Sequence, residues 1–166
     1  LVHFDAHVDT WDTIWGNRYN HGTPFRRAVE EGLIDPERSI QIGIRGPLGE
    51  RAELEQSREL GFEVWTARQV RQASVSQVLG AIWRRVGTHP VFLSFDIDFL
   101  DPVFAPGTGT PEIGGFTTWE AQEFLWGLVG LRIVGADLVE VLPDRDPSGV
   151  TALIAANLVF DMIAVI

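Results

Sequence analysis

Near-continuous runs of β-branched, aromatic and other apolar residues recur along the chain, and a segment with helical character separates each run from the next. Runs of this kind, without strict alternation of polar and apolar residues, are typical of parallel strands that are buried on both faces. We expect five strands, at Leu1–Asp5, Ser39–Ile44, Phe62–Trp65, Val91–Phe95 and Arg132–Val141.

The intervening segments carry helix start and stop signals. Thr23 and Pro24 offer an N-cap and a first-turn proline, and Thr117 with Glu120 forms a possible capping box. Strands that alternate with helices indicate an α/β fold of three layers, in which helices cover both faces of a mainly parallel sheet. Residues 1–166 are interpreted as one domain. Helices are expected at Phe25–Glu31, Glu50–Leu60, Val75–Val86, from Thr117 towards Gly130, and after Ser148.

Composition narrows the classes of partner and compartment. The net charge of −10 argues against binding to nucleic acid or to an anionic membrane, because both carry negative charge themselves. The chain has no cysteine, which excludes disulfides and thiol catalysis and suits a reducing, cytoplasmic location. Both ends lie in strongly apolar stretches, so we interpret the chain as a piece of a longer protein.

A first group of polar residues stands where the first strand is expected to end. In extended chain, residues i, i+2 and i+4 point to one side, so Asp5, His7 and Asp9 are expected to converge. Open α/β sheets place their ligand sites at the carboxyl ends of strands. The alternative interpretation is a polar exit from the strand in which one Asp caps a helix.

A second group follows the strongly apolar strand Val91–Phe95, which runs directly into Asp96 and Asp98. Unpaired buried carboxylates repel one another, so they need either protons or cations. Four carboxylates and one imidazole in one pocket would be neutralised by two divalent ions rather than by one. Ligands that are rich in oxygen, with one or two imidazoles, favour manganese or magnesium over zinc.

Several ordered motifs give the chain a resemblance to the arginase/agmatinase family of ureohydrolases that covers nearly its whole length. They include a first metal motif, a second one, and a loop of the agmatinase type. The matching segments are His3–Thr10, Asn20–Arg27, Gln41–Arg45, Ser94–Asp98, Leu100–Pro102, Ala105–Pro111 and Gly135–Val141.

The resemblance implies an arginase-like fold and a cofactor of two Mn²⁺ ions. It implies that Asp5 and Asp96 bridge the two ions, that His7 and Asp98 are terminal ligands of one ion, and that Asp9 is a terminal ligand of the other. The family supplies one further His ligand from a Gly-Gly-Asp-His segment upstream, which this chain lacks. It also implies a homo-oligomer, a trimer or hexamer, for the full-length protein.

The implied reaction is hydrolysis of a small guanidino substrate by a manganese-activated hydroxide, with agmatine giving putrescine and urea. Glu140 matches the carboxylate that binds the guanidinium, a role that suits bidentate pairing of two planar groups. His21 matches a proposed proton shuttle, which suits an imidazole because its pKa lies near working pH.

Alternatives remain open on the sequence. Guanidinobutyrate or another guanidino acid could replace agmatine as the substrate. A related deacetylase-like enzyme would need only one zinc with Asp, His and Asp, which leaves Asp9 and Asp98 without a role. An inactive fragment that keeps only the fold is the third possibility.

Other polar and aromatic residues receive structural interpretations. His3 is assigned to the strand face opposite the neighbours of Asp5 or to a layer behind the ligands, Asp101 to its own loop, and His89 to the surface. Arg26 and Arg27 are expected on a solvated helix face, and Asp12 and Asp137 in supporting positions. Trp11 and Trp15 follow the first metal motif and could line a substrate entrance.

Overall fold

Five parallel strands form one sheet in the order β3-β2-β1-β4-β5 in the computed structural model, which describes residues 1–46 and 52–166. Each pairing between neighbouring strands is parallel. All five strand predictions are confirmed, within a residue or two at most of their ends. The strands are β1 (Val2–Phe4), β2 (Ile40–Ile44), β3 (Glu63–Thr66), β4 (Val91–Asp96) and β5 (Ile133–Val139).

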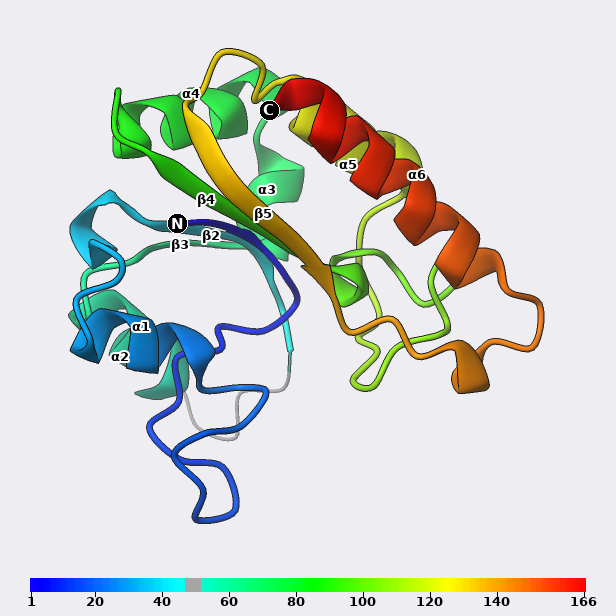
Figure 1. Ribbon diagram of the computed structural model, residues 1–166, viewed down its shortest axis with the longest axis horizontal. Coiled ribbons are helices and arrows are strands. Elements are labelled where there is room, and N and C mark those ends of the chain that lie inside the picture. The colour runs from blue at the N-terminus through cyan, green and yellow to red at the C-terminus, as the bar shows by residue number, and fades with distance from the viewer. Residues whose placement is uncertain (47–51) are drawn as a thin grey trace.

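Helices cover both faces of this sheet, which confirms the three-layer α/β prediction (Figure 1). On one side lie α1 (Pro24–Glu30) and α2 (Ala52–Glu59), and on the other lie α3 (Ala67–Gln72), α4 (Val75–Val86), α5 (Thr118–Trp126) and α6 (Val150–Val165). The part of the expected Glu50–Leu60 helix at residues 50–51 falls outside the described residues.

Two apolar cores correspond to the two faces. The larger core contains buried side chains of β1, β2 and β4 with those of α3 to α6, such as Phe4, Phe95 and Phe124. The smaller core contains Leu1, Val8, Ile44, Phe62 and Val64, against which α1 and α2 pack. The three inner strands β1, β2 and β4 are therefore buried almost throughout, as their continuous apolar sequence predicts, whereas the edge strands β3 and β5 are only partly buried.

Capping explains where several helices begin. Thr117 and Glu120 form the predicted reciprocal capping box at the start of α5. Thr66 and Gln69 form another at the start of α3, a short helix that the sequence analysis missed. The N-cap prediction for Thr23 is wrong as regards its side chain, which makes no bond to α1. Its hydroxyl instead lies 2.8 Å from the carbonyl oxygen of Arg18, because the preceding loop turns back on it.

The strand order creates a natural position for a binding site. From β1 the chain winds outward to β2 and β3, whereas β4 returns to the other side of β1 and β5 continues from it. The winding therefore reverses between β1 and β4. Ligands in open α/β sheets bind at this kind of reversal, beyond the carboxyl ends of the strands.

None of the helices in the described ranges is long and apolar enough to span a membrane.

Candidate metal centre

Four carboxylates follow the two central strands at the point where the winding reverses. β1 and β4 are paired with Phe4 opposite Phe95, so Asp5 and Asp96 leave the sheet side by side. Asp98 lies in the short 3₁₀ turn η2 (Ile97–Phe99). Asp5, Asp96 and Asp98 are almost completely buried. A cluster of acidic groups so far from solvent requires either protons or cations.

The His7 imidazole lies between two of these carboxylates. Its Nδ1 atom is 3.0 Å from Asp98 Oδ2 and 3.4 Å from Asp5 Oδ1. Burial alone would lower the pKa of His7, but its hydrogen bonds with Asp5 and Asp98 outweigh burial and raise the pKa to about 10. The Nδ1 atom thus occupies a position where a cation is strongly favoured.

The remaining carboxyl groups are destabilised as anions. Burial, reinforced by the neighbouring negative charges, raises the pKa of Asp96 to about 11 and that of Asp98 above its ordinary value. Burial and the charge of Asp5 raise the pKa of Asp9 as well. Asp5 behaves differently, since interactions with His3 and His7 overcome its burial and lower its pKa. The donor set fits divalent cations, because such ions would replace the protons that these groups otherwise hold.

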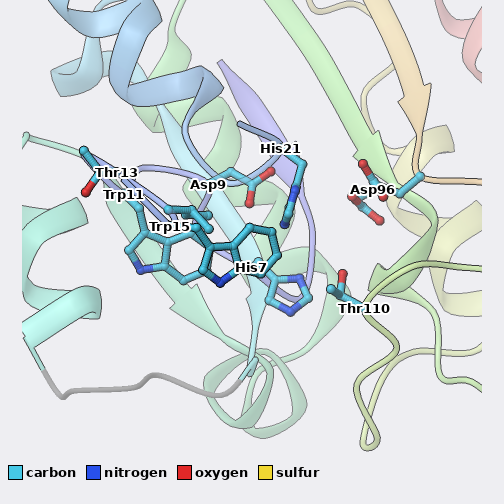
Figure 2. Close-up of a pocket in the computed structure, with 10 residues that line it drawn as sticks. His7, Asp9, Trp11, Thr13, Trp15, His21, Asp96 and Thr110 are labelled. Atoms are coloured by element: carbon cyan, nitrogen blue, oxygen red, sulfur yellow. The ribbon is translucent and has the colours of Figure 1, made fainter. Parts of the chain in front are cut away.

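Two overlapping groups have the compactness of metal sites. Ligand atoms of His3, Asp5 and Asp9 lie within 4.8 Å of one another, and so do those of Asp5, His7 and Asp98. Asp5 belongs to both groups. Among the described residues Asp96 belongs to neither, although it faces the same pocket from the end of β4 (Figure 2). The structure therefore brings together the five predicted ligands, four of them closely.

The route by which these residues meet differs from the prediction. Extended chain ends at Phe4, so Asp5, His7 and Asp9 do not converge through strand alternation. Asp9 adopts a left-handed backbone, with φ of 51°. Asp96 and Asp98 are likewise joined by a turn, in which the Asp98 N–H donates to Asp96 Oδ1 at 2.8 Å. Turns, rather than the alternation of a strand, therefore bring these side chains together.

His3 lies directly behind the candidate ligands, as one of its two interpretations predicted. Its Nε2 atom lies 2.7 Å from Asp5 Oδ2, and the residue is 1% exposed. The two-residue spacing from Asp5 in an expected strand was the available signal, because it places both side chains on one face.

An open pocket of about 350 Å³ adjoins the carboxylates. Figure 2 shows Asp96 and Thr110 on one side of it, with Asp9, Trp11 and Trp15 on the other. Its lining contains the two residues predicted to contact substrate as well as both tryptophans of the first loop. The lining residues are His7, Asp9, Trp11, Thr13, Ile14, Trp15, His21, Asp96, Thr110 and Glu140.

Glu140 and His21 reach this pocket from different elements. Glu140 comes directly after β5 and, like Asp9, has a left-handed backbone, with φ of 64°. Strained backbone at non-glycine residues clusters at functional sites, because surrounding structure must hold it. His21 lies exposed near the Trp15 ring, with centroids 6.0 Å apart in an edge arrangement.

The loop 101–115 is held by side chains on both of its sides. Asp101 accepts hydrogen bonds from the backbone N–H groups of Val103, Gly114 and Gly115, which confirms its structural role. The Thr110 hydroxyl donates to Asp98 Oδ2 at 3.2 Å. Sequence analysis missed Arg45, which donates to carbonyl oxygens of this loop from the end of β2.

Among the residues that were given structural interpretations, the prediction for Arg27 is wrong. Arg27 is not on a solvated face: it is 6% exposed and its Nη2 atom lies 2.7 Å from Asp12 Oδ1 and 2.9 Å from Glu30 Oε1. It is buried because the loop after the first metal motif folds over α1 and brings Asp12 to it. Asp12 thus ties that loop to α1. His89 is exposed, as expected.

Fold and site together define an α/β protein of the class that carries a candidate metal centre at the carboxyl edge of a parallel sheet. The centre is built from carboxylates and histidine, most of them buried. The sequence profile of the Arginase family matches residues 1–164. The chain belongs to this family.

Individual relatives agree with that assignment. The chain is 50% identical to the guanidinopropionase of Pseudomonas aeruginosa, over 100% of its own length and 52% of the relative's. It is also 50% identical to the mitochondrial agmatinase of Gallus gallus, over 100% of its own length and 49% of the relative's. The structure of proclavaminate amidino hydrolase from Streptomyces clavuligerus superposes with a TM-score of 0.90 at 42% identity, over 98% of this chain and 53% of that one. The chain thus spans about half the length of the curated relatives it matches.

Proposed function

We propose that the protein to which this chain belongs hydrolyses a guanidino compound, agmatine, to putrescine and urea with the help of two Mn²⁺ ions. The observation that carries this proposal is the place of Asp5, which lies in one compact group with His7 and Asp98 and in another with Asp9, and both His7 and Asp9 line the pocket that Glu140 also lines. A shared carboxylate is the arrangement that two neighbouring ions require.

The ligand set supports manganese. Carboxylate oxygens dominate, one or two imidazoles complete the groups, and the described residues include no sulfur ligand because the chain has no cysteine. Such sets favour hard divalent ions over zinc. When bound, a pair of divalent ions supplies a water nucleophile at neutral pH, by lowering the pKa of that water.

Residues of the chain would place the substrate above the ligands. Glu140, at the end of β5, presents a carboxylate to the pocket, where it can pair with a planar guanidinium through two parallel hydrogen bonds. This pairing would hold the guanidinium in the pocket that His7, Asp9 and Asp96 also line. His21, at the exposed side of the pocket, can give a proton to the amine nitrogen as the carbon–nitrogen bond breaks.

The lining of the pocket favours a substrate whose tail is an amine. The carboxylates of the lining are assigned to the ions or to the guanidinium, and within the described part of the chain the lining includes no lysine or arginine that could pair with a carboxylate tail. The faces of Trp11 and Trp15 can also attract a cation. Agmatine carries a cationic tail, whereas guanidino acids carry a carboxylate that would lack a basic partner here.

A guanidino acid is the second candidate, because relatives at 50% and 48% identity are named guanidinopropionase and guanidinobutyrase. The full-length protein, loaded with manganese, should be assayed for urea release from agmatine, guanidinobutyrate, guanidinopropionate and arginine. We expect the highest kcat/KM with agmatine. A preference for either guanidino acid would replace agmatine by that substrate, and an absence of urea from all four would refute guanidino hydrolysis.

A further inference from the structure

Gln41 lies in β2, and its fully buried side-chain amide makes three hydrogen bonds. These bonds are separate from the backbone hydrogen bonds that join the strands of the sheet. Its Oε1 atom accepts from the Ser57 hydroxyl of α2 at 2.6 Å. Its Nε2 atom donates to the backbone carbonyl oxygen of Val8 and lies 3.2 Å from His3 Nδ1. Gln41, Ser57 and His3 are each 1% exposed or less. The amide therefore connects α2 with the segment that carries the candidate ligands.

These contacts determine which way the amide points. A carbonyl oxygen can only accept a hydrogen bond, so the nitrogen of Gln41 must face Val8 and the oxygen must face Ser57. The second hydrogen on that nitrogen is then available to His3 Nδ1, which must act as an acceptor. The neutral His3 ring consequently carries its proton on Nε2.

The proton on Nε2 faces Asp5. The distance from His3 Nε2 to Asp5 Oδ2 is 2.7 Å, so the imidazole donates a strong hydrogen bond to one oxygen of this carboxylate. Packing of the His3 ring against Phe25, with centroids 4.5 Å apart, restricts its rotation. Asp5 Oδ1 meanwhile accepts from the backbone N–H of His7. Both oxygens of Asp5 are thus oriented, and the carboxylate is fixed towards both ligand groups.

We infer that Gln41 is a positioning residue of the metal centre, which orients Asp5 through His3 and holds the chain between His7 and Asp9 through the carbonyl of Val8. The inference rests on the proposed metal-dependent function. A ring nitrogen that orients a ligand carboxylate needs a fixed tautomer, and partners of this kind typically change metal affinity about 10–100-fold when removed. The opposite tautomer would place a lone pair of Nε2 against Asp5 Oδ2 and repel it.

The variants to compare in the full-length protein are Gln41→Leu, Gln41→Glu and Ser57→Ala. Gln41→Leu removes every polar contact, and Gln41→Glu keeps an acceptor for Ser57 but loses both donors. Ser57→Ala is the matched control, because it deletes a buried hydrogen bond of the same network and leaves the donors of Gln41 in place. Manganese affinity, measured by titration, should fall about 10–100-fold in both Gln41 variants and change less than threefold in Ser57→Ala.

Nitrogen NMR of the metal-free protein reports the tautomer of His3. This tautomer would not change if Gln41 only stabilised the fold. Wild type and Ser57→Ala should show His3 protonated on Nε2, whereas Gln41→Leu should show a mixture of tautomers. A wild-type His3 protonated on Nδ1 overturns the inference even if no variant folds. Wild-type manganese affinity in a folded Gln41→Leu protein also overturns it. If the metal affinities are as expected but the wild-type protein releases no urea, only the proposed reaction is refuted. If the wild-type protein binds no manganese, both the proposed reaction and the positioning role of Gln41 are refuted.

Discussion

The guanidinium of Arg45 donates to the backbone carbonyl oxygen of Asp98 at 2.6 Å, so a residue at the end of β2 fixes the turn that carries a candidate ligand. The same nitrogen also lies 2.9 Å from the carbonyl oxygen of Glu112 and 3.2 Å from that of Leu100. Arg45 therefore joins three stretches of chain around the site: the sheet, the turn at Asp98 and the loop 101–115. The guanidinium, with five N–H donors in a fixed planar group, can serve several carbonyl oxygens at once.

Arg45→Met should accordingly destabilise the protein by about 2–4 kcal/mol, since it leaves buried carbonyl groups without donors. Because Thr110 on the same loop contacts Asp98, urea release should fall as well. The measurements are thermal unfolding and kcat/KM of the full-length enzyme. Arg38→Met is the matched control: Arg38 is half exposed and its ion pair with Asp35 is 3.6 Å long. Equal effects of the two substitutions would contradict the role of Arg45.

A second prediction separates metal binding from substrate binding. Asp5→Asn should remove metal and activity together, because Asp5 belongs to both ligand groups. Glu140→Gln should retain manganese and lose about a hundredfold or more in kcat/KM, because a neutral amide leaves the guanidinium without a counter-charge. Elemental analysis and urea release should be measured on the same preparations. Loss of manganese from Glu140→Gln would place Glu140 among the ligands instead.

A third prediction concerns protons. The raised pKa values of His7, to about 10, and of Asp96, to about 11, mean that both groups hold a proton at neutral pH in the metal-free protein. Manganese binding must therefore release protons. Calorimetric titration at pH 7.5 in buffers with different ionisation enthalpies should show release of at least one proton per protein. Heats that do not depend on the buffer would contradict it.

The same shifts set the pH dependence of metal-free stability. A group whose pKa is higher in the folded state binds more protons there, so stability decreases as pH rises between its unfolded and folded values. For Asp96 that window runs from 3.8 to about 11, and for His7 from 6.5 to about 10. With a chelator present, the melting temperature should thus fall as pH rises from 6 to 9, and saturating manganese should remove most of this slope.

The fourth prediction concerns the 166-residue chain by itself. Helix α6 is apolar on nearly all sides and exposes Leu153, Phe160 and Ile163, each more than 60% accessible. Such a helix normally lies inside a protein. Light scattering should therefore show self-association, and Phe160→Glu together with Ile163→Lys should reduce it. Without the upstream His ligand that the family resemblance implies, we also expect weak binding of one ion and little turnover; a monomeric, fully active chain would contradict both expectations.

The sequence predicted the features that depend on local pattern. The inner strands β1, β2 and β4 were visible because burial on both faces demands a continuous apolar run, and Asp5, His7, Asp9, Asp96 and Asp98 were visible because they end two such runs. The bonds from Gln41 to His3 and Val8, and from Arg45 to Asp98 and Ile113, were not visible, since these partners lie 33 to 68 residues away along the chain. Burial of Arg27 was missed for the same reason: its partner Asp12 belongs to a loop that folds back over α1.

The left-handed backbone at Asp9 and Glu140 has a consequence for engineering the protein. Glycine adopts this conformation without the steric cost of a side chain, so a glycine at either position would relax strain on the order of 1 kcal/mol. A library selected only for heat resistance would thus be drawn towards glycine at two positions that line the pocket. Selection for thermal stability and selection for catalytic turnover would therefore favour different residues at these two positions. A variant selected only for stability would be expected to keep the fold and lose activity.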